Sequence, residues 1–142
     1  MEALINDPHP ALDRDAIIAG LMAPLLLWTG SVMFVTLMGY PGVVCMTPAA
    51  WLFAMLVGAR IRRDSTTPGT GPIREAAIAG AILGFWEGAL FAAAMAASKY
   101  IPSATLNDPP NPYLVGTVAI LLSMPVTTGI SVLVAWKTRP AE

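Results

Sequence analysis

The chain has 142 residues, of which 56% are hydrophobic and 12% are charged, a balance far from that of a soluble domain. Its net charge of -1 excludes the basic surface that nucleic-acid binding requires. The single cysteine excludes an internal disulfide, and the single histidine, His9, precedes the first apolar stretch and is not placed to bind haem or chlorophyll. We therefore expect one membrane domain, 1–142, that carries no cofactor of its own.

Four apolar stretches follow an N-terminal segment, 1–15, and each is long enough to cross the bilayer as a helix. In chain order the predicted spans are 16–38, 42–59, 76–98 and 113–136, with a loop at 60–75 and a proline-rich loop at 99–112. A backbone in lipid must satisfy its own hydrogen bonds, and runs of this length are helices rather than barrel strands. The predicted fold class is all-α, an integral membrane four-helix bundle.

The basic residues predict the direction of the spans, because Lys and Arg are retained on the cytoplasmic side. With four spans, only Lys99 falls on one side, and all the others fall on the opposite side: Arg14, Arg60, Arg62, Arg63, Arg74, Lys137 and Arg139. We therefore expect a multi-pass protein of the inner (cytoplasmic) cell membrane, with both termini and the loop 60–75 in the cytoplasm and the loop 99–112 outside.

Two segments of the chain resemble each other. Residues 14–20 (RDAIIAG) and 74–80 (REAAIAG) differ at only two positions, and one difference exchanges Asp for Glu. Pro48 and Pro125 also precede the basic residues Arg60 and Lys137 by the same interval. This pattern favours two tandem helical hairpins related as a parallel repeat, with convergence among Ala-rich helices as the alternative.

Small residues occupy every fourth position of the third predicted span. Such a row lets helix backbones approach closely in lipid, where van der Waals packing drives helix association. The sequence therefore predicts a helix-packing face whose partner is another span, a second copy or a different subunit. Its members are Ala76, Gly80, Gly84, Gly88, Ala92 and Ala96.

Glu87 is the only acid inside a predicted span, and no span contains Lys, Arg or His to pair with it. An ionised carboxylate at that depth costs at least about 2.5–3.5 kcal/mol, so we expect the neutral form, hydrogen-bonded to a hydroxyl or a backbone carbonyl. Four roles stay open: a proton relay, a quinone or lipid-headgroup contact, a charge paired with another subunit, and a hydrogen bond that fixes helix register. The candidate hydroxyls are Thr29, Ser31, Thr47, Thr117, Ser123, Thr127 and Thr128.

Chemistry-bearing motifs are sparse, whereas packing surfaces are abundant. The sequence lacks a Ser/His/Asp set, a Walker loop, a dinucleotide fingerprint and HExxH, so we expect no enzyme and no metal site. The predicted function is that of a non-catalytic accessory subunit in a multi-subunit membrane complex of electron transport or photosynthesis. It would contact the lipid bilayer and other membrane subunits, or a second copy, through the small-residue row. Bound lipid, quinone or pigment is compatible with three mid-span tryptophans, Trp28, Trp51 and Trp86.

The alternative function is a small oligomeric proton-coupled transporter or channel with Glu87 as the titrating group. In size, span number and a lone membrane glutamate, the chain resembles the small multidrug resistance transporters. That resemblance implies an oligomer in which proton binding at Glu87 drives transport. The glutamate of that family lies in the first span, whereas Glu87 lies in the third.

Overall fold

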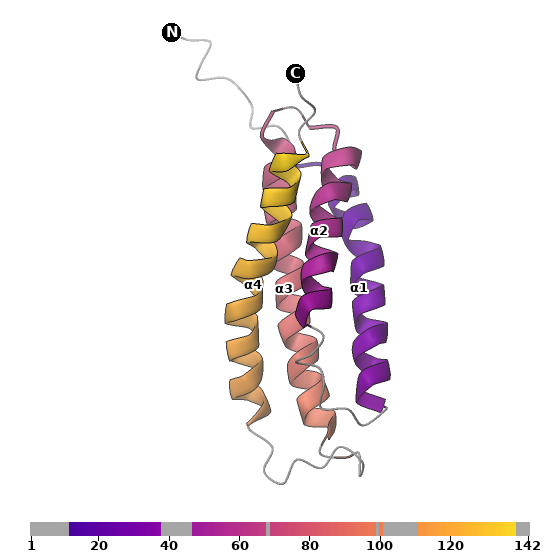
Figure 1. Cartoon of the computed structure of the whole chain (residues 1–142), viewed down its shortest axis with the longest axis vertical. Helices are drawn as coiled ribbons and strands as arrows, with labels where there is room; N and C mark the ends of the chain where they lie inside the picture. Colours follow the sequence, from indigo (N-terminus) through magenta and orange to yellow (C-terminus); the bar gives the residue numbers. More distant parts are fainter. Residues whose placement is uncertain (1–11, 38–46, 68, 99, 101–110, 139–142) are drawn as a thin grey trace.

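The computed structural model describes residues 12–37, 47–67, 69–98, 100 and 111–138. Its regular elements within these ranges are four helices: α1 (Arg14–Leu37), α2 (Thr47–Asp64), α3 (Gly71–Ser98) and α4 (Pro112–Lys137). Figure 1 shows them as an up-and-down bundle, in which α1 and α3 begin at the end where α2 and α4 finish. The predicted all-α four-helix bundle is confirmed. Most of the N-terminal segment, the turn after 37 and most of the loop 99–112 lie outside the described residues.

Local signals in the sequence explain where the helices begin. The Asp13 carboxylate accepts a hydrogen bond of 3.0 Å from the Ala16 backbone N–H, and so caps α1. Asn111 caps α4 in the same way, with Pro112 in the first helical turn, where its missing N–H is not needed. Gly69, in the connection before α3, has a φ of 66°, a conformation that favours glycine.

The second helix differs from its predicted span, 42–59. The described helix starts at Thr47 and continues through Arg60 to Asp64, so its last turn is charged. Its apolar part, 47–59, rises only about 20 Å, less than the ~30 Å hydrocarbon core. Three described helices, α1, α3 and α4, are long and apolar enough to cross a membrane. Residues 42–46 of the predicted span lie outside the described part.

The helices do not pack equivalently. In the described ranges α2 and α3 each contact the other three helices, whereas α1 and α4 make almost no contact with each other. One core cluster, which includes Leu21, Ile61, Leu83 and Ala135, draws on all four helices. A second cluster around Trp28 draws on α1, α2 and α3 only. Figure 1 shows that the described part of α2 runs along only part of the bundle's length, with α3 between α1 and α4 in this view.

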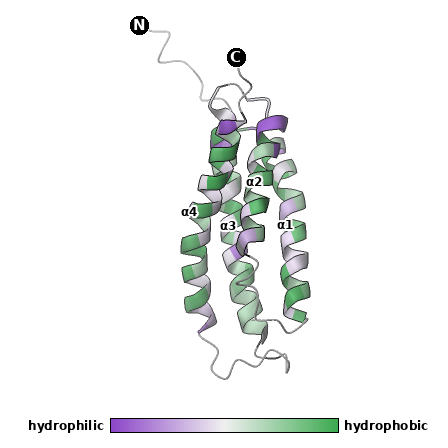
Figure 2. Cartoon of the chain, viewed as in Figure 1, coloured by the Kyte–Doolittle hydropathy of each residue, from purple (hydrophilic) through white to green (hydrophobic). Residues whose placement is uncertain are grey.

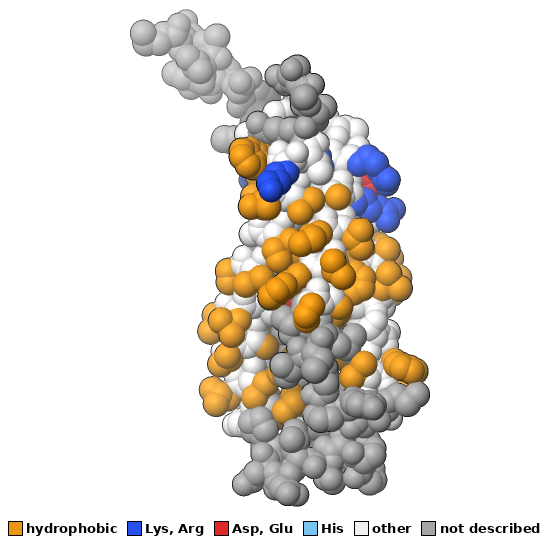
Figure 3. All heavy atoms as spheres, viewed as in Figure 1, with side chains coloured by type: hydrophobic (Ala, Val, Ile, Leu, Met, Phe, Trp, Pro, Cys, Tyr) orange, Lys and Arg blue, Asp and Glu red, His pale blue; other side chains and the backbone are white. Residues whose placement is uncertain are grey.

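The outer surface of the bundle is apolar. Large side chains with more than half of their surface exposed occur on α1, α2, α3 and α4, among them Phe34, Leu52, Phe85 and Leu121. Figure 2 shows hydrophobic residues along the helices and hydrophilic ones gathered where α2 ends, and Figure 3 shows Lys and Arg side chains at that end. We call it the basic end. The apolar helices indicate contact with a lipid bilayer.

Candidate functional site

The glycines of the small-residue row lie against α4. A Cβ atom added to Gly84 would lie 2.4 Å from Thr127 Oγ1 and 2.6 Å from Met124 Cα. A Cβ added to Gly88 would lie 2.4 Å from Ile120 Cγ1. These distances are shorter than any real Cβ contact, so only glycine permits this approach of the two backbones.

The remaining members of the row are less uniform. Gly80 meets the backbone of α4 at Thr127 O, 2.8 Å from an added Cβ, and Ala76 is fully buried. Ala92 lies opposite Gly116 of α4, while Ala96 is half-buried. The glycine part of the row is therefore covered by α4 of the same chain and offers no free surface to another subunit.

Two buried hydroxyls also hold α4 in place. Thr127 Oγ1 donates to Gly80 O at 2.7 Å, and Ser131 Oγ donates to Ala54 O at 2.9 Å. Both residues are completely buried. The first bond joins α4 to α3 and the second joins α4 to α2, so the register of all three helices is fixed by hydrogen bonds as well as by close packing.

Glu87 lies on α3, about midway along the helix, with 8% of its surface exposed. The Ser123 side chain of α4 hydrogen-bonds to its carboxyl group. The close approach of α4 at Gly88 brings Ser123 within reach. The second carboxyl oxygen, Oε2, is buried and has no hydrogen-bond partner in the described part of the chain. Of the hydroxyls that the sequence offered, the structure places Ser123 beside Glu87 and commits Thr127 to a backbone carbonyl.

Trp28 of α1 is a second buried polar side chain close to Glu87. Only 2% of its surface is exposed, and its ring packs edge-on against Phe53 with centroids 6.1 Å apart. The indole Nε1 is buried without a hydrogen-bond partner among the described residues. Nearby, Trp86 Nε1 donates to Thr29 Oγ1 at 2.9 Å, which ties α3 to α1 on the exposed side.

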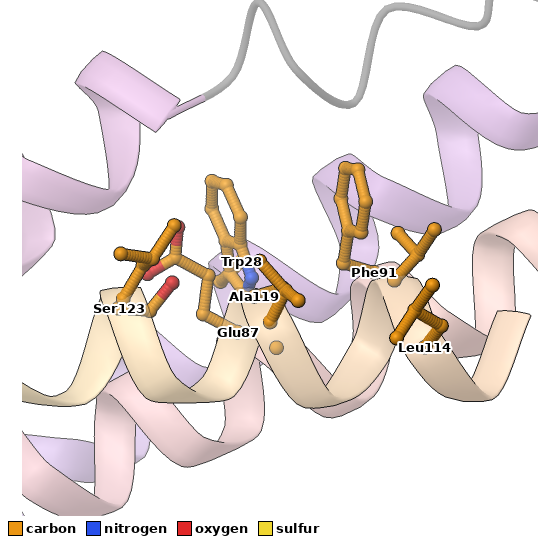
Figure 4. A pocket seen from close by; sticks show the side chains of 10 residues that line it. Trp28, Glu87, Phe91, Leu114, Ala119 and Ser123 are labelled. Carbon is orange, nitrogen blue, oxygen red and sulfur yellow. The ribbon is translucent and has the colours of Figure 1, made fainter.

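Trp28, Glu87 and Ser123 meet in a pocket of about 400 Å³ between α1, α3 and α4. Figure 4 shows the indole nitrogen and the carboxyl group close together, with Ala119 beside them and Phe91 and Leu114 farther along. Every other lining side chain is apolar. The volume of this pocket and the small number of polar groups that line it are typical of a small-molecule site. The complete lining is Trp28, Glu87, Gly88, Phe91, Leu114, Val115, Val118, Ala119, Leu122 and Ser123.

The structure reveals a second buried acid, Glu75, which falls in the predicted loop 60–75. Glu75 belongs to the first turns of α3 and is completely buried. Its Oε1 accepts from the Asp13 backbone N–H at 2.8 Å and from the Thr67 hydroxyl, while Oε2 has no partner within the described ranges. Steps of four residues lead from Glu75 through Ala79 and Leu83 to Glu87, and the structure buries all four.

Asp13 connects the beginning of α1 to the α2–α3 connection outside the membrane spans. Its Oδ2 accepts from the Thr66 backbone N–H at 3.1 Å and from the Thr66 hydroxyl at 2.7 Å. The backbone hydrogen bonds from Thr66 and Ala16 lower the pKa of the Asp13 carboxyl below its ordinary value of 3.8. Together with Glu75, this carboxylate ties the starts of α1 and α3 to one loop.

Within the described residues no group of three or more His, Cys, Asp and Glu side chains could hold a metal ion. No protein-family model matches the chain, and neither does a curated protein or a solved structure.

Proposed function

We propose that the chain is a non-catalytic membrane subunit that holds a neutral, membrane-soluble molecule in the pocket between α1, α3 and α4. The observation that carries this proposal is that Trp28 and Glu87 line one otherwise apolar pocket and that each has a buried polar atom, Nε1 or Oε2, without a partner among the described residues. A buried polar atom without a partner costs about 1–3 kcal/mol. A ligand that supplies both hydrogen bonds recovers that cost.

The chemistry of the pocket defines the class of ligand. No cationic side chain of the described residues lines it, and its position near the middle of α3 makes a charged headgroup costly. The ligand must accept a hydrogen bond from the indole N–H of Trp28 and exchange one with a neutral Glu87 carboxyl. A quinone or quinol head meets both requirements. Its apolar tail would lie along Leu114 and Val118, whose outer surfaces are exposed.

The same pocket favours a place in a larger assembly. Leu114 and Leu122 on its wall expose 64% and 63% of their surface, so a ligand seated there is accessible from the lipid side and from any neighbouring subunit. Because α4 covers the glycines of the small-residue row, a partner subunit would bind this outer face rather than that row. An electron-transport or photosynthetic complex would use such a site to hold its quinone or pigment.

Proton-coupled transport is the second candidate. The buried Glu87 oxygen near the middle of α3, which has no partner in the part of the chain that the structure describes, favours it. The hydroxyls between Glu87 and the basic end weigh against it. Thr127 and Ser131 donate to backbone carbonyls, so their protons are engaged in fixed hydrogen bonds. A proton relay through these two hydroxyls would have to break both hydrogen bonds.

Exchanging Glu87 separates the two candidates. The amide of Glu87→Gln still donates and accepts hydrogen bonds, whereas Glu87→Leu does neither. In nanodiscs titrated with decyl-ubiquinone and analysed by native mass spectrometry, we expect near-normal binding by Glu87→Gln. Glu87→Leu and Trp28→Phe should each bind about 5-fold more weakly. Trp51→Phe, on α2 and outside the pocket lining, is the matched control and should bind normally.

Wild-type binding by both Glu87→Leu and Trp28→Phe would refute the binding proposal. Proton flux in liposomes that is present in the wild type and abolished by Glu87→Gln would establish transport instead, because the amide cannot carry the proton.

A further inference from the structure

A second hollow lies between α1 and α2, away from the Glu87 pocket. Its volume is about 360 Å³, and its apolar walls include Leu27 of α1 with Phe53 and Leu56 of α2. At the basic end it finishes at Arg60 and Arg63. We call it the α1–α2 groove.

The sequence explains why the groove exists. The two helices meet closely where Gly20 faces Ile61, because a Cβ on Gly20 would lie 2.8 Å from Ile61 Cγ1. Beside that contact the facing side chains are small, Ala23 on α1 and Ala59 on α2, and both line the groove. The backbones of α1 and α2 are therefore close, with alanines beside the contact and larger side chains around them. This arrangement leaves a groove that is open to lipid.

The charges at the mouth of the groove are unbalanced. Asp64 pairs with Arg60 at 3.4 Å and with Arg63 at 2.8 Å, so two guanidinium groups share one carboxylate. Hydrogen bonding to Arg63 lowers the pKa of Asp64, and the same pair raises the pKa of Arg63. The Arg63 side chain is still 74% exposed. A net positive site remains, with guanidinium forks that match the geometry of a phosphate.

The length of the groove along α2 matches the thickness of one leaflet of the hydrocarbon core. From Phe53 to Arg63 the helix rises about 15 Å, half of the ~30 Å hydrocarbon core. A cationic mouth above an apolar furrow of this length fits a molecule with an anionic head and an acyl chain, because arginine side chains reach toward the headgroup layer while their stems cover apolar surface.

We infer that the α1–α2 groove binds an anionic phospholipid from the leaflet at the basic end. Its phosphate lies on Arg60 and Arg63, and one acyl chain runs along Leu27, Phe53 and Leu56. The site is independent of the Glu87 pocket, since the two share no lining residue. A protein partner would explain the apolar walls but not the arginine pair at one leaflet's depth.

The test uses the full chain in nanodiscs of equal phosphatidylglycerol and phosphatidylcholine, with retained lipids counted by native mass spectrometry. We expect the wild type to retain phosphatidylglycerol preferentially. Arg60→Gln with Arg63→Gln should lower that preference about 25-fold, or about 5-fold for each arginine. The control, Arg14→Gln with Arg74→Gln, removes the same charge outside the groove lining and should keep the preference.

A third variant, Ala23→Phe, fills the groove while leaving both arginines in place, and it should also lose the retained lipid. The inference is overturned if the wild type retains both lipids equally, or if the Arg60/Arg63 variant behaves as the wild type does. It also fails if the Arg14/Arg74 control loses the preference to the same degree, because the attraction would then be a general surface effect. Thermal melts of each variant establish that the fold is retained.

Discussion

Replacing Gly84 by alanine should loosen the contact between α3 and α4. The added Cβ would lie 2.4 Å from Thr127 Oγ1 and 2.6 Å from Met124 Cα. Thr127 cannot simply rotate away, because its hydroxyl donates to Gly80 O at 2.7 Å, and Met124 Cα moves only if the α4 backbone moves. The substitution therefore forces the two helices apart.

The expected magnitude combines two opposing effects. Overpacking a close contact costs about 1–3 kcal/mol, while alanine gains about 0.5–1 kcal/mol over glycine inside a helix. We expect a net loss of about 1–2 kcal/mol in unfolding free energy. Gly129→Ala is the matched control, because nothing lies within 4 Å of an added Cβ at that position of α4. The control should be as stable as the wild type or gain up to about 1 kcal/mol.

Unfolding in mixed micelles of mild detergent and dodecyl sulfate, followed by circular dichroism, measures both variants. A Gly84→Ala variant as stable as Gly129→Ala would contradict this prediction. That result would mean that the glycines do not face α4. The small-residue row would then be free to bind another subunit.

Three further predictions use polar contacts. Ser131→Ala should lower the unfolding free energy by about 0.6–1.7 kcal/mol, because the 2.9 Å bond to Ala54 O is lost; micelle unfolding measures it. Trp86→Phe should cost at most a similar amount through its bond to Thr29, and the loss in a double variant with Thr29→Val should be smaller than the sum of the two single losses, because both remove the same bond. Asp13 has a lowered pKa in the fold, so its stabilisation is present above the ordinary pKa of 3.8 and is lost as the pH falls through the lower folded value. Asp13→Asn should flatten the stability curve below the ordinary pKa, and an unchanged curve would contradict the assignment.

The sequence was sufficient to predict the helices, because apolar length alone decides what can cross a bilayer. The predicted third and fourth spans, 76–98 and 113–136, lie inside the helices Gly71–Ser98 and Pro112–Lys137. The bounds of the second helix were harder to predict, because a charged turn through Arg62 continues the helix beyond the apolar stretch. Hydropathy cannot separate the end of a helix from the end of a membrane span.

The site was less predictable. Glu87 stands out as an acid in an apolar run, but its surroundings depend on how far α1 lies from α4, which no local pattern encodes. Trp28 was one of three mid-span tryptophans, and only the packing of α1 on α3 places it beside Glu87. Glu75 was missed because it sits at the edge of an apolar run, where an acid is normally solvated. Its burial arises from tertiary contacts with Asp13 and Thr67.

Mass spectrometry of the small molecules that co-purify with the chain tests whether the pocket around Trp28 and Glu87 holds a neutral ligand. Ala119→Phe, which fills the pocket from α4, is the comparison. We predict one neutral, membrane-soluble molecule with a hydrogen-bonding head in the wild-type extract and its loss from the filled variant. Identical extracts from the two proteins would contradict the claim.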